Sequence, residues 1–216
     1  MTTLRTRTKI CGLTRPEDAR CAAEAGADAL GVILHADSPR VIGLRDAAEV
    51  FSAGGLFVAR VGVFVDAPDA VVEEAISRLG LDYVQFHGSE SPERCARTSV
   101  PVIKALRIGD AFDEAELAPY LGLVAGVLVD SLDPQAQGGT GSAFPWRLVE
   151  GVAARVPLLL AGGLRPTNVG AAIAQVRPFA VDVSSGVERT PGIKDHAAIR
   201  AFCAAVRKAD DERIHP

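Results

Sequence analysis

Polar and sulfur-bearing side chains close short apolar runs at several points along this 216-residue chain. Cys11 ends the first run, His87 follows another, and Asp130 and Asp182 lie in two more. Thiol, imidazole and carboxyl groups are side chains that transfer protons in enzymes. Strands buried on both faces read as continuous apolar runs, and their carboxyl ends form the active-site face of a parallel barrel. The pattern therefore predicts acid–base chemistry at one common mouth.

Alternation of side chains along a strand decides which of these groups can meet. Lys9 and Cys11 lie on one face of the first run, and Gln85 and His87 lie together on one face of another. We expect these polar residues, with Asp182, to point into the interior while the valines beside them meet outer helices. Burying charged groups is costly unless they pair or bind a ligand, so a ligand site is the least costly explanation.

Each candidate also has a purely structural explanation. Cys11 can be an inert core residue, since free cysteine is often buried. His87 can donate to a strand-end carbonyl group, and Asp130 can cap the loop that follows its strand. Asp182 can be no more than a buried partner for Lys9. These alternatives remain open from the residues alone.

The elements that would position these groups alternate strictly between strand and helix. Strands are predicted at residues 6–11, 29–34, 57–64, 83–86, 101–107, 124–130, 157–161 and 180–183. Helices are predicted at residues 16–25, 45–54, 68–79, 92–98, 113–121, 145–155, 166–176 and 195–208. Eight such units without a G-x-G-x-x-G motif favour an α/β fold, an eight-stranded parallel (β/α)8 TIM barrel, over a doubly wound sheet.

We expect this barrel to be one domain over residues 1–208, followed by a charged, frayed tail over residues 209–216. Parity along the fifth strand does not decide whether Lys104 or Arg107 faces inward. Both residues stay unassigned.

Two glycine-containing loops predict a phosphate site. Gly162-Gly163 follows the seventh predicted strand, and Ser184-Ser185-Gly186 follows the eighth. Phosphate groups bind at these two loops in barrels of this class, and glycine lets backbone N–H groups approach closely. Tight turns without a ligand are the alternative. A third loop, Gly138-Gly139-Thr140-Gly141, suits a lid, although a solvent-exposed turn would look the same.

Composition narrows the partners to small molecules. The net charge of −4 comes from interspersed charges without a basic stripe, which argues against nucleic acid and anionic membranes. Residues 1–7 are polar, and no run approaches the roughly 20 apolar residues of a membrane span, so we expect a cytoplasmic protein. The cysteines, which imply neither disulfides nor zinc, are Cys11, Cys21, Cys95 and Cys203.

An ordered series of motifs covers nearly the whole chain. They are Lys9-Ile10-Cys11-Gly12, Ser38-Pro39-Arg40, Val61-Gly62-Val63-Phe64, Val84-Gln85-Phe86-His87-Gly88, Asp130, Gly138-Gly139-Thr140-Gly141, Gly162-Gly163-Leu164, Pro178 through Glu188, and Lys194-Asp195-His196. In this order they resemble the phosphoribosylanthranilate isomerase family of tryptophan biosynthesis. The resemblance implies an Amadori rearrangement of N-(5-phosphoribosyl)anthranilate that needs no cofactor and no metal.

The resemblance also implies roles for particular residues. Cys11 is expected to be the general base that removes the proton from ribose C2, and Asp130 the general acid that protonates the ring oxygen. Arg40 is expected to hold the anthranilate carboxylate, for which a planar guanidinium is well suited. The expected supporting residues around the substrate are Gln85, His87 and Asp182. The family includes monomers and homodimers, so either state is expected.

The sequence departs from the family pattern at two places, and other functions compete with the isomerase. His35-Ala36-Asp37 replaces an aromatic-proline-basic stretch before Arg40, and Ala161 replaces a serine before the glycine pair. A phosphosugar epimerase would need metal ligands, and a synthase would need lysine and glutamate at strand ends; neither set is complete. A non-catalytic phosphoribosyl-binding module would keep the glycine loops but would have no reason to retain Cys11 and Asp130 together.

Overall fold

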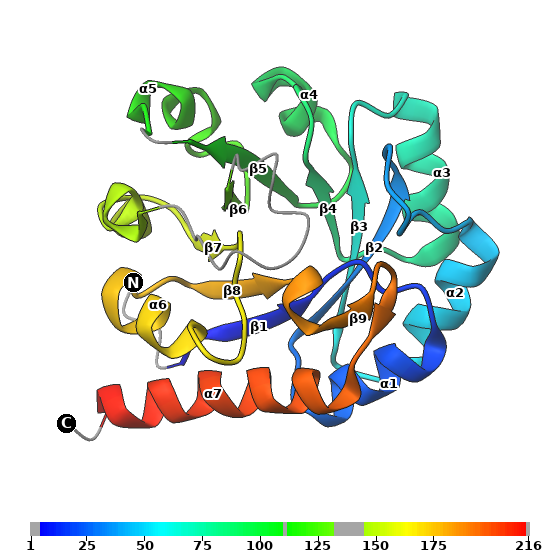
Figure 1. Cartoon of the computed structure of the whole chain (residues 1–216). Helices are drawn as coiled ribbons and strands as arrows, with labels where there is room; N and C mark the ends of the chain where they lie inside the picture. Colours follow the sequence, from blue (N-terminus) through cyan, green and yellow to red (C-terminus); the bar gives the residue numbers. More distant parts are fainter. Residues whose placement is uncertain (1–4, 110–111, 132–144, 215–216) are drawn as a thin grey trace.

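The computed structural model describes residues 5–109, 112–131 and 145–214, and within them eight parallel strands close into a barrel in which β1 adjoins β8 (Figure 1). The strands are β1 (Arg7–Ile10), β2 (Ala29–His35), β3 (Ala59–Phe64), β4 (Tyr83–Phe86), β5 (Val102–Ile108), β6 (Gly126–Ser131), β7 (Leu158–Leu160) and β8 (Ala180–Val183). Each overlaps a predicted strand, so the predicted barrel is confirmed. The predicted lid loop at residues 138–141 lies outside the described residues.

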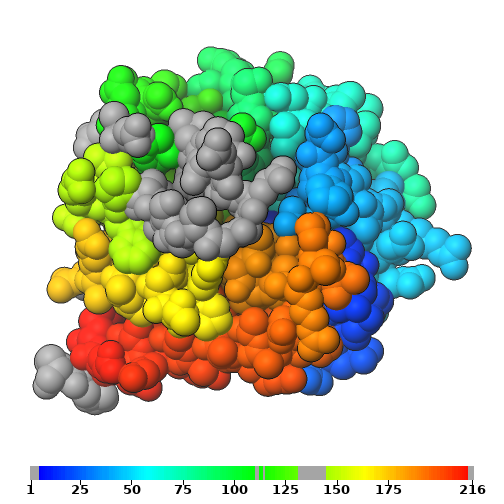
Figure 2. All heavy atoms as spheres, in the orientation of Figure 1, coloured from blue at the N-terminus to red at the C-terminus, as the bar shows by residue number. Residues whose placement is uncertain are grey.

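Helices cover the outside of the barrel. They are α1 (Pro16–Glu24), α2 (Leu44–Ala53), α3 (Asp69–Leu79), α4 (Pro92–Arg97), α5 (Glu114–Leu117), α6 (Val169–Val176) and α7 (His196–Ile214). A short 3-10 helix, η1 (Ala118–Tyr120), extends α5. The first and last of these helices, α1 and α7, lie side by side (Figure 2). None of the helices within the described ranges is long and apolar enough to cross a bilayer.

Two helix predictions need correction. Residues 145–155 form two 3-10 helices, η2 (Trp146–Val149) and η3 (Val152–Ala154), on either side of Gly151. α6 begins at Val169 rather than at residue 166, because Oδ1 of Asn168 accepts a hydrogen bond from the backbone N–H of Arg165 at 2.7 Å and closes a turn first.

The predicted fraying from residue 209 is wrong as far as the structure describes the tail, because α7 continues to Ile214. Asp210 explains the extension. Its carboxylate accepts hydrogen bonds from the backbone N–H and the hydroxyl of Thr6, at 2.6 and 2.8 Å. These buried bonds attach the last turns of α7 to the segment that leads into β1.

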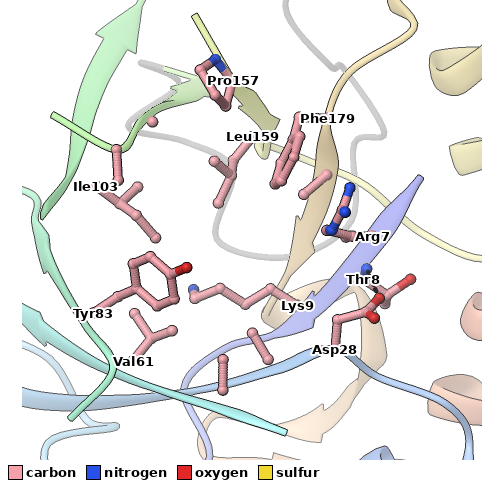
Figure 3. A pocket seen from close by; sticks show the side chains of 15 residues that line it. Arg7, Thr8, Lys9, Asp28, Val61, Tyr83, Ile103, Pro157, Leu159 and Phe179 are labelled. Carbon is pink, nitrogen blue, oxygen red and sulfur yellow. Dashed lines mark hydrogen bonds between the residues drawn. The ribbon is translucent and has the colours of Figure 1, made fainter. Parts of the chain in front are cut away.

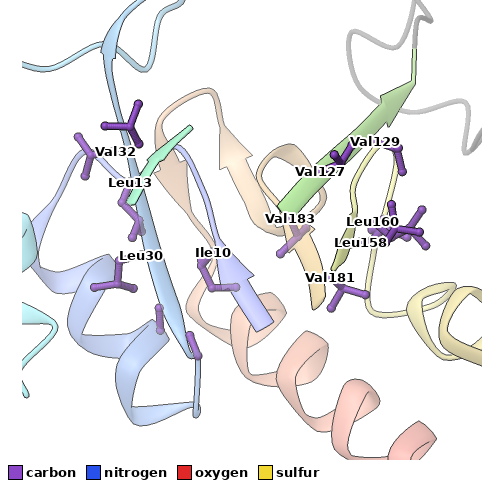
Figure 4. Close-up of a cluster of buried hydrophobic side chains, with 14 of the residues drawn as sticks. Ile10, Leu13, Leu30, Val32, Val127, Val129, Leu158, Leu160, Val181 and Val183 are labelled. Carbon is purple, nitrogen blue, oxygen red and sulfur yellow. The ribbon is translucent and has the colours of Figure 1, made fainter. Parts of the chain in front are cut away.

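Two apolar layers follow from the alternation of side chains along the strands. Outward side chains pack against the helices, and Figure 4 shows part of this layer, including Ile10, Val129, Val181 and Val183. Inward side chains form a second cluster that includes Val61, Ala105 and Leu128. The valines beside the polar strand residues, Val84, Val129, Val181 and Val183, therefore face the helices, as predicted, and the polar residues between them face inward.

The amino ends of the strands surround a cavity of about 310 Å³ (Figure 3). Its walls are mainly apolar, with Tyr83, Ile103, Leu159 and Phe179 among them. The guanidinium group of Arg7 lies 4.3 Å from the centre of the Phe179 ring. This cavity, called the floor cavity below, lies at the end of the barrel opposite the predicted mouth.

Candidate active site

Strand β1 carries a lysine and a cysteine into the barrel at its carboxyl end. Lys9 is 2 % exposed and Cys11 is 6 % exposed. Lys9 is in register with Asp182 of β8, and its Nζ donates a hydrogen bond to Oδ1 of Asp182 at 2.9 Å. The backbone N–H of Cys11 donates to the carbonyl of Val183 at 2.8 Å, which holds the residue beyond the end of β1. Asp182 is thus the buried partner of Lys9.

The charges around Cys11 oppose one another. Burial is the largest effect and raises the pKa of the Cys11 thiol overall, although the Lys9 ammonium acts in the opposite direction by charge and by hydrogen bonding. Burial also disfavours the charged form of Lys9, but Asp182 and Cys11 outweigh it and raise the pKa of Lys9 to about 12. Lys9 is therefore a cation at neutral pH, in position to stabilise an ionised thiol.

A second group of inward residues links β4 to β6. Nε2 of Gln85 lies 3.1 Å from Nδ1 of His87, and Nε2 of His87 lies 3.5 Å from Oδ2 of Asp130. The amide nitrogen can only donate, so Nδ1 accepts and the proton of a neutral imidazole sits on Nε2, facing Asp130. Within the described residues, the buried Oε1 of Gln85 accepts no hydrogen bond. It is an acceptor available to a ligand.

Arg40 lies in the segment after β2 and forms a two-bond ion pair, called the clasp below, with a glutamate near the other end of the chain. Its Nε and Nη2 donate to the two carboxylate oxygens of Glu188 at 2.8 and 2.7 Å. Glu188 begins β9 (Glu188–Thr190), which pairs with β10 (Ile193–Lys194) after the barrel closes. Burial raises the pKa of Glu188, but Arg40 and Lys194 outweigh it and lower the pKa overall. The clasp fixes the guanidinium beside the mouth.

Lys194 joins this cluster from β10. Its Nζ donates to Oε1 of Glu188 at 2.9 Å and to the carbonyl of Ser184 at 3.1 Å. Gly12 makes the packing possible, because a β-carbon there would lie 2.7 Å from both Cδ of Arg40 and Oγ of Ser184. Its φ of +68° is in the left-handed region, which glycine adopts without strain.

The two loops predicted to bind phosphate pack directly against each other. Gly162 and Gly163 have φ values of +78° and +66°, so the chain turns there through left-handed conformations. A β-carbon on Gly186 would lie 1.9 Å from the carbonyl oxygen of Leu164, which leaves no space for a side chain. Ser184 precedes the 3-10 helix η4 (Ser185–Val187). The backbones of the two loops thus meet beside the carboxyl ends of β7 and β8.

The structure shows on which face of β5 each of the two unassigned basic residues lies. Lys104 is buried on the outward face, and its Nζ lies 2.8 Å from Oε2 of Glu90. Arg107 is exposed, shares parity with the inward residue Ala105, and is in register with Asp130. Lys104 is therefore structural, and Arg107 lies at the mouth.

Sequence reasoning assigned no role to Glu188 or Lys194. The available signal was a run of charged residues continuing past the eighth strand, but a clasp between segments 148 positions apart has no periodicity in the sequence. Within the described ranges, no three His, Cys, Asp or Glu side chains gather as metal ligands would.

Comparisons with known proteins match nearly the whole chain and agree with one another on the family. A family model for N-(5'phosphoribosyl)anthranilate (PRA) isomerase matches residues 8–205. The N-(5'-phosphoribosyl)anthranilate isomerase of Pseudomonas fluorescens strain SBW25 is 49 % identical over 204 residues, which cover 94 % of this chain and 96 % of the relative.

Solved structures agree with these matches. The crystal structure of phosphoribosyl anthranilate isomerase from Thermotoga maritima superimposes with a TM-score of 0.86 at 40 % identity, covering 94 % of this chain and 99 % of the other. A phosphoribosyl anthranilate isomerase in complex with reduced 1-(o-carboxyphenylamino)-1-deoxyribulose 5-phosphate superimposes with a TM-score of 0.81 at 38 % identity, with the same coverage.

Proposed function

The chain belongs to the N-(5'-phosphoribosyl)anthranilate isomerase family, and from this premise we propose that Cys11 and Asp130 are the general base and general acid of its reaction. The enzyme isomerises N-(5-phosphoribosyl)anthranilate to 1-(2-carboxyphenylamino)-1-deoxyribulose 5-phosphate in tryptophan biosynthesis. The observation that carries the proposed roles is the placement of both side chains at inward positions, at the carboxyl ends of β1 and β6.

The Amadori rearrangement needs one proton delivered and one removed. The Asp130 carboxyl group gives a proton to the ring oxygen as the bond from that oxygen to C1 breaks, which leaves a C1=N iminium group. The Cys11 thiolate then takes the proton from C2, and the electron pair of that bond neutralises the iminium as an enol amine. Tautomerisation to the C2 ketone completes the reaction. C1 is reduced and C2 oxidised within one molecule, so electrons balance.

Three sets of residues support substrate binding in this proposal. Arg40 holds the anthranilate carboxylate, and its clasp by Glu188 presents the guanidinium in one orientation. The backbone amides of the two packed loops hold the phosphate: Gly162, Gly163, Ser184, Ser185 and Gly186. Gln85, His87 and Asp182 complete the surroundings, with the open acceptor on Gln85 available to a sugar hydroxyl.

We expect Arg40→Lys to raise KM about tenfold or more with a smaller change in kcat, because an ammonium cannot make the two parallel bonds of a guanidinium. Steady-state kinetics would measure both parameters. Arg45→Lys is the matched control, since Arg45 is exposed on α2 and forms a surface ion pair with Glu49 at 3.8 Å. An unchanged KM in Arg40→Lys would remove Arg40 from the carboxylate site.

A direct assay tests the function as a whole. Purified protein is mixed with freshly generated N-(5-phosphoribosyl)anthranilate, and loss of the substrate's fluorescence is followed against the spontaneous rate. Turnover supports the isomerase. Saturable binding of the substrate without turnover would instead indicate a non-catalytic phosphoribosyl-binding module.

We also infer that the enzyme is a homodimer, formed through the amino-terminal face of the barrel. A solved structure described as monomers generated from the dimeric phosphoribosylanthranilate isomerase of Thermotoga maritima is 37 % identical with a TM-score of 0.81, so a relative of this chain is a dimer. In this chain, Leu56 is 83 % exposed and Phe57 is fully exposed, in the turn between α2 and β3. Phe57 also has a φ of +65°, which costs a residue with a β-carbon about 1–2 kcal/mol.

The exposed turn and the floor cavity lie on the same face. The depression beside the turn shares Ala59 and Tyr83 with the floor cavity. A two-fold axis would let each Leu56-Phe57 tip enter the floor cavity of the partner, so one apolar surface would be buried twice. We therefore infer that the Leu56-Phe57 tip of a second copy of this chain occupies the floor cavity.

Phe57→Asp is expected to shift the dimer toward monomer. Burying a phenylalanine contributes about 2 kcal/mol, so losing two per dimer weakens association about a thousandfold. Sedimentation velocity over a range of protein concentrations measures the shift, with Val71→Asp, an apolar position on α3 that is 38 % exposed, as control. A wild-type protein that is monomeric at all concentrations would contradict the inference.

We place the enzyme in the cytoplasm as part of the same proposal. Cys11, Cys21, Cys95 and Cys203 are all buried free thiols. Proteins of the reducing cytosol keep thiols in this form, whereas secreted domains usually pair them.

A further inference from the structure

Gly31 of β2 forms a small recess in the barrel wall that holds two reactive groups together. A β-carbon on Gly31 would lie 2.8 Å from Sγ of Cys11 and 3.0 Å from Nζ of Lys9. Both atoms therefore occupy the space that any other residue would fill. The conformation of Gly31 is ordinary for a strand, since it is not among the glycines with positive φ. The recess, rather than the backbone, is what requires glycine.

We propose that Lys9 is a positioning residue of the isomerase, whose ammonium group, anchored by Asp182 and seated with the Cys11 thiol over Gly31, favours the ionised, proton-accepting form of that thiol. The inference rests on the proposed role of Cys11 as the base. It adds the cation that makes a buried cysteine usable in that role. The thiolate, and not the thiol, accepts the proton from C2.

Lys9 is the cation best placed for this task. Among the residues that the structure describes, the other cations that interact with Cys11 are Lys194 on β10 and Arg40 after β2. Both are already bound to the same carboxylate, that of Glu188, at 2.9 and 2.7 Å. One carboxylate offsets only part of their combined charge, but Lys9 acts on the Cys11 thiol more strongly than Lys194 does.

Asp182 of β8 has two opposite effects. It fixes the Lys9 ammonium at 2.9 Å and keeps it protonated, but its own negative charge disfavours a second anion at Cys11. An ammonium group has three N–H donors, so Lys9 can donate hydrogen bonds to the Asp182 carboxylate and to the Cys11 sulfur at the same time. Lys9 and Asp182 should thus act on Cys11 with opposite sign.

The opposite signs separate this proposal from a purely structural role. If the pair only fills the barrel interior, removing either partner leaves a buried uncompensated charge and destabilises the fold in the same direction. If Lys9 stabilises the thiolate, Lys9→Met raises the pKa of Cys11 and Asp182→Asn lowers it. The thiolate then forms at higher pH in the first variant and at lower pH in the second.

The experiment titrates the ultraviolet absorbance of the thiolate in the full-length enzyme, taking the difference between each variant and the same variant carrying Cys11→Ser. We expect the midpoint to rise by about one pH unit or more in Lys9→Met and to fall in Asp182→Asn. The ascending limb of the pH profile of kcat should move with it. At neutral pH, Lys9→Met should lose about tenfold or more in kcat, regained in part in alkaline buffer, and Lys9→Arg should restore much of the loss.

Lys104→Met is the matched control, because it also removes a buried lysine from an ion pair, on the outward face. It should destabilise the fold without moving the Cys11 midpoint. Gly31→Ala should lower kcat by filling the recess, whereas Gly151→Ala, where a β-carbon meets no atom within 4 Å, should not.

Midpoints that stay in place, or that move the same way in Lys9→Met and Asp182→Asn, would overturn the positioning role of Lys9. Full activity in Cys11→Ser would instead overturn the proposed role of Cys11 as the base. The two failures are therefore distinguishable.

Discussion

Cys11→Ser is expected to reduce kcat by about 10²–10⁴-fold, the loss that accompanies removal of a general base. A serine hydroxyl is nearly the size of a thiol and fits the recess at Gly31, but it does not ionise at neutral pH even beside the Lys9 ammonium. Steady-state kinetics with N-(5-phosphoribosyl)anthranilate measures the loss. Because the change removes a proton acceptor rather than a binding contact, kcat should fall much more than KM changes.

Binding and folding controls keep this result interpretable. Reduced 1-(o-carboxyphenylamino)-1-deoxyribulose 5-phosphate, the compound bound in a solved relative, should bind Cys11→Ser about as tightly as wild type. Cys21→Ser is the matched variant, since Sγ of Cys21 lies 3.7 Å from the carbonyl of His196, a partner that a hydroxyl can also serve. It should keep normal kcat. Wild-type turnover in Cys11→Ser would assign the base to another group.

Asp130→Asn is expected to reduce kcat to a similar extent, about 10²–10⁴-fold, because an amide has the shape of the carboxyl group but cannot deliver a proton to the ring oxygen. Steady-state kinetics with the natural substrate is again the measurement. Asp130→Glu retains a proton donor on a longer side chain and should keep part of the activity.

His87 offers the alternative source of the proton. Its Nε2 lies 3.5 Å from Oδ2 of Asp130, so it is the neighbouring group most able to replace it. If Asp130→Asn retains most of its activity and His87→Asn loses it, the acid is the histidine. If Asp130→Asn is inactive and also fails to bind the reduced product analogue, the aspartate acts in binding rather than in proton transfer.

Strand positions were predictable because each barrel strand is buried on both sides. Runs such as Leu158–Leu160 contain only apolar residues, which is typical of a strand buried on both sides. Two-residue alternation assigned Lys9 and Cys11 to one face and Ile10 to the other. Helices were less predictable where tertiary contacts overrode local preference. Residues 145–155 form 3-10 turns, and α7 extends to Ile214 because Asp210 bonds to Thr6, a residue 204 positions away.

Several assignments within the site depended on the register of strands that are distant in the chain. Asp182 meets Lys9 because β8 closes on β1 with these two residues paired. Lys104 and Arg107 lie on opposite faces of β5, and only the closed barrel shows which face is inside. Local spacing carries no information about such cross-barrel neighbours.

The sequence by itself determined the eightfold alternation, the inward or outward direction of most strand residues, and the motifs that identify the family, because these depend on neighbours a few positions apart. Tertiary structure alone decided that Gly31 leaves space for the Cys11 sulfur and the Lys9 ammonium together, and that Glu188 clasps Arg40. Both depend on how far adjacent strands are staggered when the sheet closes, a property of the whole barrel that no single segment encodes.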